Sequence, residues 1–119
     1  SDVYKRQDIE RWHINEMKSL LSRFSGVKFI FDNVKQKYYP VLRDAITSFR
    51  SKNEGKPLVV IDDTPFIDFD ILDYPVNDIE EIFLLKGSDA AIWGPKASNG
   101  IIVIITQRGK STKIEQKEE

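Results

Sequence analysis

Residues 77–109 read NDIEEIFLLKGSDAAIWGPKASNGIIVIITQRG, and this stretch decides the fold. The run Ile101–Thr106 is apolar without alternation, which is typical of a strand that is buried on both faces and therefore central in its sheet. Glu81–Leu85 predicts a second strand. Residues 88–93 predict a short helix between the two strands, capped by its first serine and ended by Gly94-Pro95, because proline cannot continue a helix.

Three further elements are predicted upstream of this stretch. Leu58–Ile61 is a continuous apolar run and predicts a strand, which ends in a tight turn at residues 62–65. Val27–Phe31 has high β propensity and predicts another strand. A helix capped by Asn15 is predicted over residues 15–24, because its apolar residues fall on one face. These apolar residues are Met17, Leu20, Leu21 and Phe24.

The remaining segments have weaker patterns. Residues 38–42 fit either an edge strand or a packed loop, because Pro40 cannot donate to the ladder of a central strand. Residues 45–50 fit a short strand, and residues 75–80 fit one helical turn capped by Asn77. The predicted fold class is α+β, a small mixed sheet of about four strands with short helices packed on it.

The chain of 119 residues fits one compact domain. This domain is predicted to cover residues 8–110. Residues 1–7 have no clear pattern and are assigned to an N-terminal extension outside the domain. Residues 111–119 are assigned to a charged tail that is expected to fray. No apolar run reaches the roughly 20 residues that a transmembrane helix needs.

Composition excludes several classes of function. The formal net charge is −1 and basic residues are scattered among acids, which argues against a nucleic-acid-binding protein. The chain has no cysteine, so disulfides and thiol chemistry are excluded. Its single histidine, His13, cannot form a histidine metal cluster. No residue is assigned to catalysis, to a cofactor or to a metal ion.

An acid-rich segment lies between the strand at residues 58–61 and the strand at residues 81–85. Its aspartates lack the spacing of a calcium-binding loop, so a solvated loop is favoured over a metal site. Acid–base catalysis by paired carboxylates is a third interpretation, which would need two of them in an apolar cleft. These residues are Asp62, Asp63, Asp68, Asp70, Asp73 and Asp78.

Residues 77–109 resemble the plug domain of TonB-dependent outer-membrane receptors, most closely those of the SusC/RagA-like class. The shared pattern is a strand, a turn with lysine, a small-residue helix, an aromatic–glycine step, an Asn-Gly turn and an apolar strand that ends in threonine. Residues 57–65 (PLVVIDDTP) are similar to the family's Pro-Leu-x-Val-Ile-Asp-Gly-x-Pro segment. Residues 49–51 (Phe-Arg-Ser) stand where the family has Ile-Arg-Gly.

Two positions depart from the family's pattern, because Ser51 and Asp63 replace glycines. Residue 63 can still form a turn, since aspartate tolerates the left-handed conformation better than most residues. Within the motif, Trp93 is interpreted as a core anchor rather than a ligand platform. The residues that match the family's motif are Arg50, Asp62, Pro65, Lys86, Gly87, Trp93, Gly94, Asn99, Gly100 and Thr106.

The resemblance implies a plug without enzymatic activity that sits inside the β-barrel of its own receptor in the outer membrane, on the periplasmic side. It would occlude the barrel and couple substrate binding to energised transport. The implied partners are that barrel, the periplasmic TonB energy-coupling protein and an outer-membrane substrate. Residues 33–45 and 66–74 are then expected to be exposed working loops, on a scaffold of residues 58–61, 82–85 and 101–105. The alternative is a plug-like adaptor or binding module in a barrel-less multidomain periplasmic or surface protein.

Overall fold

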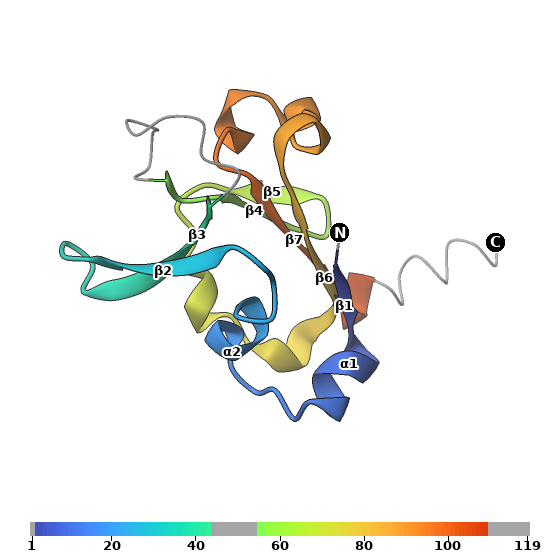
Figure 1. The fold of residues 1–119 in the computed structure, drawn as a ribbon. Helices are drawn as coiled ribbons and strands as arrows, with labels where there is room; N and C mark the ends of the chain where they lie inside the picture. Colours follow the sequence, from blue (N-terminus) through green and yellow to red (C-terminus); the bar gives the residue numbers. More distant parts are fainter. Residues whose placement is uncertain (1, 44–54, 110–119) are drawn as a thin grey trace.

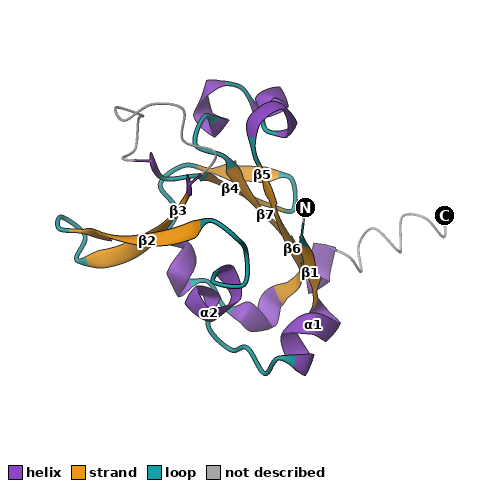
Figure 2. Ribbon diagram, in the orientation of Figure 1, coloured by secondary structure: helices purple, strands orange, loops and turns teal. Residues whose placement is uncertain are grey.

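The computed structural model describes residues 2–43 and 55–109 (Figure 1). They form a five-stranded sheet in the order β1-β6-β7-β4-β5 and a separate two-stranded hairpin of β2 and β3, with short helices between (Figure 2). The strands are β1 (Val3–Lys5), β2 (Val27–Asp32), β3 (Lys37–Leu42), β4 (Leu58–Ile61), β5 (Thr64–Phe66), β6 (Ile79–Leu85) and β7 (Ile101–Thr106). The helices are α1 (Arg6–Arg11), α2 (Met17–Leu21) and the 3-10 helices η3 (Ile71–Asp73), η4 (Val76–Asp78), η5 (Gly87–Asp89), η6 (Ala91–Trp93) and η7 (Pro95–Ala97).

Strand β7 lies at the centre of the larger sheet. It pairs in parallel with β4 and antiparallel with β6, so both of its edges are hydrogen-bonded. The side chains of Ile101, Ile102 and Ile104 are 0% exposed. The prediction of a central, doubly buried strand from an apolar run without alternation is therefore confirmed.

The two faces of β7 pack into two different cores, because successive side chains of a strand point to opposite faces. Ile102 and Ile104 join the larger core with residues of α1, α2, η3 and η4. Ile101 joins a smaller core against the 3-10 helices, where Ala90 and Ala97 let the backbone come close. The small-residue segment after β6 therefore serves as a cover for one end of the sheet.

The predicted helix over residues 15–24 is shorter in the structure. Helix α2 covers Met17–Leu21, and Glu16 rather than Asn15 occupies the N-cap position, without a side-chain cap hydrogen bond. The predicted apolar face is confirmed, because all four of its members are buried. Packing of this face, rather than capping, therefore accounts for the position of the helix.

Strand β5 is an element that the sequence pattern does not predict, because residues 62–65 indicate only a turn. Asp62 and Asp63 form a two-residue hairpin loop with φ values of 47° and 69°. Positive φ at both central residues is the geometry that tight β-hairpins favour. The chain then returns as β5, antiparallel to β4, and Pro65 is accommodated because β5 is an edge strand.

The assignment of residues 1–7 to a non-domain extension is corrected by the structure. Residues 3–5 form β1 and pair with β6, whose outer edge would otherwise lack a partner strand. The ring of Tyr4 also packs against Trp12 and Phe24, at centroid distances of 5.2 and 4.4 Å. The chain thus enters the sheet before residue 8.

Other differences are local. Residues 88–93 form successive 3-10 turns instead of one helix, and the turn η4 follows Pro75 instead of a cap at Asn77. The five-stranded sheet and the hairpin replace the expected sheet of about four strands. The predicted strand at residues 45–50 and the tail at residues 111–119 lie outside the described residues. Among the described helices, none has the length and hydropathy needed to cross a membrane.

The central position of β7 predicts a large cost for Ile102→Ala. Truncation leaves a cavity under a side chain that is 0% exposed, so the free energy of unfolding should fall by about 2–5 kcal/mol. Ile92→Ala is the matched control, because Ile92 is 88% exposed and its loss should change stability by less than about 0.5 kcal/mol. Urea unfolding measures both, and similar effects of the two variants would contradict a core centred on β7.

Candidate functional site

The motif residues lie in two groups at opposite ends of β7. Antiparallel pairing places the end of β6 beside the start of β7, and parallel pairing places the ends of β4 and β7 together. Arg50 lies outside the described residues. The group at the end of β7 comprises Asp62, Pro65 and Thr106, and the group at its start comprises Lys86, Gly87, Trp93, Gly94, Asn99 and Gly100.

Asp62 links the hairpin turn after β4 to the end of β7. Its backbone amide donates to the Ile104 carbonyl at 3.0 Å. Its carboxylate accepts hydrogen bonds from the backbone amide of Thr106 at 3.0 Å and from the Thr106 hydroxyl at 2.5 Å. The Asp62 carboxylate therefore holds the ends of the parallel strands β4 and β7 together, at the point where their backbone hydrogen bonds end.

Gly109 completes this contact, which explains the glycine at the end of the motif stretch. Its amide donates to the Thr106 hydroxyl at 3.0 Å. A Cβ added at residue 109 would lie 2.7 Å from Asp62 Cγ, closer than side chains tolerate. The segment after β7 is thus folded directly over the Asp62 carboxylate.

The second group shapes the connection from β6 to β7. Gly87 and Gly94 adopt φ values of 55° and 80° with open space around them, so backbone conformation rather than crowding requires glycine there. The Gly100 carbonyl accepts a hydrogen bond from Leu58 N at 3.0 Å, and the buried Asn99 side chain donates to the Lys56 carbonyl at 3.3 Å. These contacts fix the start of β7 beside β4.

Trp93 packs against the smaller core and is only partly buried. The Lys96 ammonium lies 6.0 Å from the centre of its ring. This packing is consistent with the interpretation of Trp93 as a core anchor, and the Lys96 ammonium lies at the limit of a cation–π contact with the ring.

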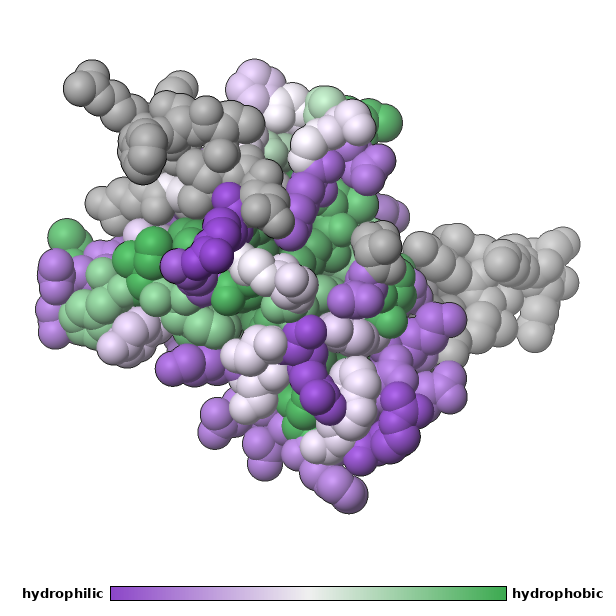
Figure 3. All heavy atoms as spheres, viewed as in Figure 1, coloured by the Kyte–Doolittle hydropathy of each residue, from purple (hydrophilic) through white to green (hydrophobic). Residues whose placement is uncertain are grey.

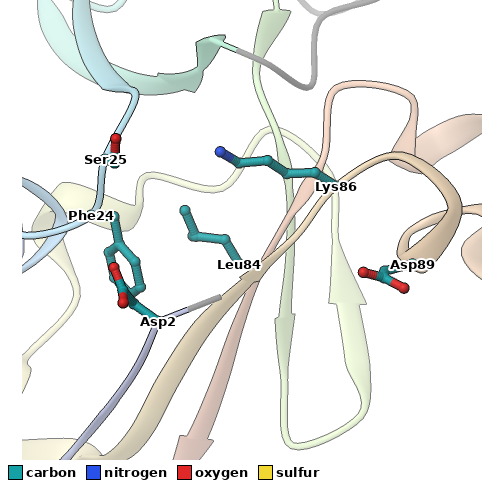
Figure 4. Close-up of a pocket in the computed structure, with 6 residues that line it drawn as sticks. All are labelled: Asp2, Phe24, Ser25, Leu84, Lys86 and Asp89. Carbon is teal, nitrogen blue, oxygen red and sulfur yellow. The ribbon is translucent and has the colours of Figure 1, made fainter.

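Lys86 lines a cavity of about 210 Å³ between the end of β6 and the end of the α2 segment. Figure 4 shows its side chain extending over Leu84 toward Ser25, with Phe24 on the far side. Asp2 and Asp89 complete the lining. The Asp89 amide donates a hydrogen bond to the Lys86 carbonyl at 3.2 Å, which holds these two lining residues together.

Three of the six aspartates in the acid-rich segment form ion pairs with lysines that local sequence patterns do not connect to them. Lys35 contacts Asp68 and Asp70 at 3.2 and 3.3 Å, and Lys37 contacts Asp73 at 2.6 Å and Asp70 at 3.6 Å. Lysines from the β2–β3 hairpin thus reach aspartates that lie before and within η3. The lysine–aspartate cluster comprises Lys35, Lys37, Lys56, Asp32, Asp68, Asp70 and Asp73.

Lys56 is the most buried cation of this cluster. Its ammonium contacts Asp32 at 3.0 Å and Asp68 at 2.8 Å, and it lies 4.8 Å from the centre of the Tyr39 ring. Burial acts to lower the pKa of Lys56, but the hydrogen bonds to Asp68 and Asp32 raise it above its ordinary value. The same hydrogen bonds from Lys56 lower the pKa of Asp32 and of Asp68.

Two further aspartates of the segment have structural partners. Asp62 is held by Thr106, and Asp78 accepts a hydrogen bond from the Tyr74 hydroxyl. Burial, followed by this contact with Asp78, raises the pKa of Tyr74. Within residues 2–43 and 55–109, no group of acidic or histidine side chains is arranged to hold a metal ion. Asp62, Asp68, Asp70 and Asp73 therefore act as cross-links between segments.

The sequence places the residues of these cross-links at the ends of predicted strands, but it does not show which of them meet. Asp32 follows a predicted strand, and its carboxylate also accepts from the amides of Val34 and Lys35 at 2.9 and 3.1 Å. Lys56 stands just before another predicted strand. Their meeting depends on how the hairpin lies over the sheet, which local patterns do not specify.

This fold is similar to that of known proteins. A family model described as TonB-dependent Receptor Plug Domain matches residues 1–101. The crystal structure of the siderophore receptor PirA from Acinetobacter baumannii is similar, with a TM-score of 0.66 and 21% sequence identity. The match covers 89% of this chain and 17% of that chain. At this identity the likeness establishes the fold, and this chain spans less than a fifth of that receptor's length.

The packing of Gly109 on Asp62 predicts a coupled pair of substitutions. Gly109→Ala should lower the free energy of unfolding by on the order of 1–3 kcal/mol, because its Cβ collides with the carboxylate. In an Asp62→Gly background the collision is absent, so the same change should cost little. A double-mutant cycle by urea unfolding measures this coupling, and an equal cost of Gly109→Ala in both backgrounds would refute the contact.

The lysine–aspartate cluster predicts a specific loss of stability in acid. Because the pKa values of Asp32 and Asp68 are lowered in the folded state, their contribution is present above about pH 4, where unfolded aspartates are ionised. It is lost as the pH falls through the lowered folded pKa values. Lys56→Met should therefore be less stable at pH 7 and lose less stability on acidification than the original chain. Parallel pH profiles from chemical denaturation would argue against this role of Lys56.

Proposed function

Because the chain belongs to the TonB-dependent receptor plug domain family, which is not a family of enzymes, we propose that it is the plug of an outer-membrane transporter. The domain occludes the lumen of the receptor's own β-barrel and couples substrate binding to energised transport. Its partners in this proposal are that barrel, the periplasmic TonB energy-coupling protein and a substrate that arrives from outside the cell. The match of the family model to residues 1–101 carries the proposal.

The way the chain packs is suited to a movable stopper. The five-stranded sheet provides a rigid body, since β7 is paired on both edges and packed on both faces. Charged and polar residues cover much of the view in Figure 3, as a wet lumen would require. A body of this kind can make many weak contacts with a barrel wall and still move.

We propose that the working surfaces are the segment Phe66–Tyr74 and the described part of residues 33–45. Val34 at the hairpin tip is 93% exposed, and Ile67 is 60% exposed. Both segments also contain buried anchors, namely Leu42 and Ile71. Exposed tips on buried anchors would let these segments meet a ligand or the barrel while the scaffold stays folded.

The proposal also implies a cellular location and a class of receptor for this domain. A plug that closes an outer-membrane barrel lies at the outer membrane and is reached from the periplasm. The motif of Lys86-Gly87, Asn99-Gly100 and Gly109-Lys110 supports the SusC/RagA-like class. We take residues 8–110 as the plug domain, to which β1 adds an edge strand, and residues 111–119 as its charged tail.

The second candidate function is a plug-like adaptor in a barrel-less periplasmic or surface protein, which the charged residues 111–119 favour. The reading frame that follows Glu119 discriminates between the two. A transporter requires several hundred further residues with strands of about ten alternating residues, whereas an adaptor requires none.

Occlusion is tested by conductance of the full-length protein in a planar lipid bilayer. The intact protein should be closed, and deletion of residues 8–110 should give open channels. Ile92→Ala, an exposed substitution, is the control and should leave the intact protein closed. Equal conductance with and without residues 8–110 would rule out a plug function, and TonB-independent uptake of the substrate would rule out the coupling.

A further inference from the structure

We propose that part of the β2–β3 hairpin opens from the rest of the domain as a unit, and that the lysine–aspartate cluster is the latch that holds it closed. The unit is residues 30–39, which we call the hairpin arm. The inference stands on the contacts of the arm and does not depend on the proposed function.

The arm has no backbone pairing with the larger sheet. Among the described strands, β2 and β3 pair only with each other, from Val27↔Leu42 at the base to Asp32↔Lys37 near the tip. A two-stranded hairpin alone is marginally stable in water. The arm therefore depends on side-chain contacts for its position.

The base of the hairpin is anchored by apolar packing, whereas the arm is not. Val41 and Leu42 are 3% and 0% exposed, and Phe29 packs against the larger core. Beyond the base, Tyr39 is partly buried beside Lys56, whereas the other large apolar side chains of the arm are turned to solvent, and Figure 3 shows apolar residues gathered over the hairpin. These exposed side chains are Ile30, Phe31, Val34 and Tyr38.

Ion pairs connect the arm to the rest of the domain. Lys35 and Lys37 reach from the arm to the segment 68–73, and Lys56 reaches from the start of β4 back to Asp32 on the arm. On the other side, the Lys18 ammonium of α2 lies 5.1 Å from the centre of the Tyr38 ring. The pairs of Lys35 and Lys37 are partly exposed, so they are individually weak and are screened by salt, whereas the Lys56–Asp32 pair is mostly buried and is screened less. Loss of these side-chain contacts does not require unfolding of the core.

The contact beneath the arm leaves only a small gap. The arm and the segment 68–71 line a crevice of about 10 Å³, which is close to the space of one water molecule. Asp68, which bridges Lys35 and Lys56, has a φ of 57°, a left-handed conformation that aspartate tolerates better than most residues but that is still less favoured than the right-handed one. Release of the latch would relax this residue and uncover Phe69 and Ile71.

The base of the hairpin is held together at the residues that flank it. Gly26 has a φ of 82° and directly precedes β2, and its carbonyl accepts a hydrogen bond from Arg43 N at 3.0 Å. This bond closes the base of the hairpin across its two ends. The arm can therefore move relative to a base that remains closed.

Native-state hydrogen exchange of the 119-residue chain tests the proposal. Amides of residues 30–39 should exchange through an opening with a small but measurable denaturant dependence, while amides of β6 and β7 exchange only through global unfolding. Raising the salt concentration from about 20 to about 500 mM should speed exchange in the arm and leave β6 and β7 almost unchanged.

Two variants separate the latch from general effects of charge. Lys56→Gln should speed exchange of the arm about tenfold, because it removes both of the most buried contacts of the cluster. Lys28→Gln is the matched control, since Lys28 is exposed on β2 and has no ion pair among the described residues. Its exchange should equal that of the original chain.

Three results would overturn the proposal. The first is exchange of the arm at the rate and denaturant dependence of β6 and β7, which would mean that the hairpin unfolds only with the whole domain. The second is exchange without any denaturant dependence, which would mean local fraying. The third is an equal effect of Lys28→Gln and Lys56→Gln, which would remove the latch from the explanation.

Discussion

The rest of the structure depends on the burial of β7 between β4 and β6. An apolar strand of this kind must satisfy its backbone groups on both edges and its side chains on both faces. Parallel pairing with β4 and antiparallel pairing with β6 meet the first need, and the two cores meet the second. The motif residues lie at the two ends of this strand. Glycines with positive φ form the connection that leads into β7, and the hydrogen bond between Thr106 and Asp62 fixes the end of β7 to the turn after β4.

The domain combines two modes of attachment. The sheet is joined by backbone ladders and apolar packing, whereas the hairpin arm is joined to the rest of the domain mainly by lysine–aspartate pairs. Contacts of the second kind are weaker and depend on the salt concentration. Half of the acid-rich segment belongs to this second mode, because Asp68, Asp70 and Asp73 bind lysines of other segments.

Local patterns predict the scaffold well because its strands are either wholly apolar or bounded by clear turns. Ile101–Thr106, Leu58–Ile61 and the apolar face of α2 are all predicted, and the structure buries each of them. Strand β5 escapes prediction because its turn uses Asp62-Asp63 rather than the usual glycine, and β1 because a three-residue strand carries almost no pattern. The lysine–aspartate cluster could not be predicted, since its members come from segments that meet only through the tertiary fold.

The backbone NOEs of Val103 measure the central position of β7 directly. In the five-stranded sheet this residue lies opposite Val60 on β4 and opposite Phe83 on β6. An NMR spectrum of the 119-residue chain should therefore contain cross-strand backbone NOEs from Val103 to both neighbours, with parallel spacing on one side and antiparallel spacing on the other. NOEs to only one of them would make β7 an edge strand, which would contradict both a core built around this strand and the placement of the motif residues at its two ends.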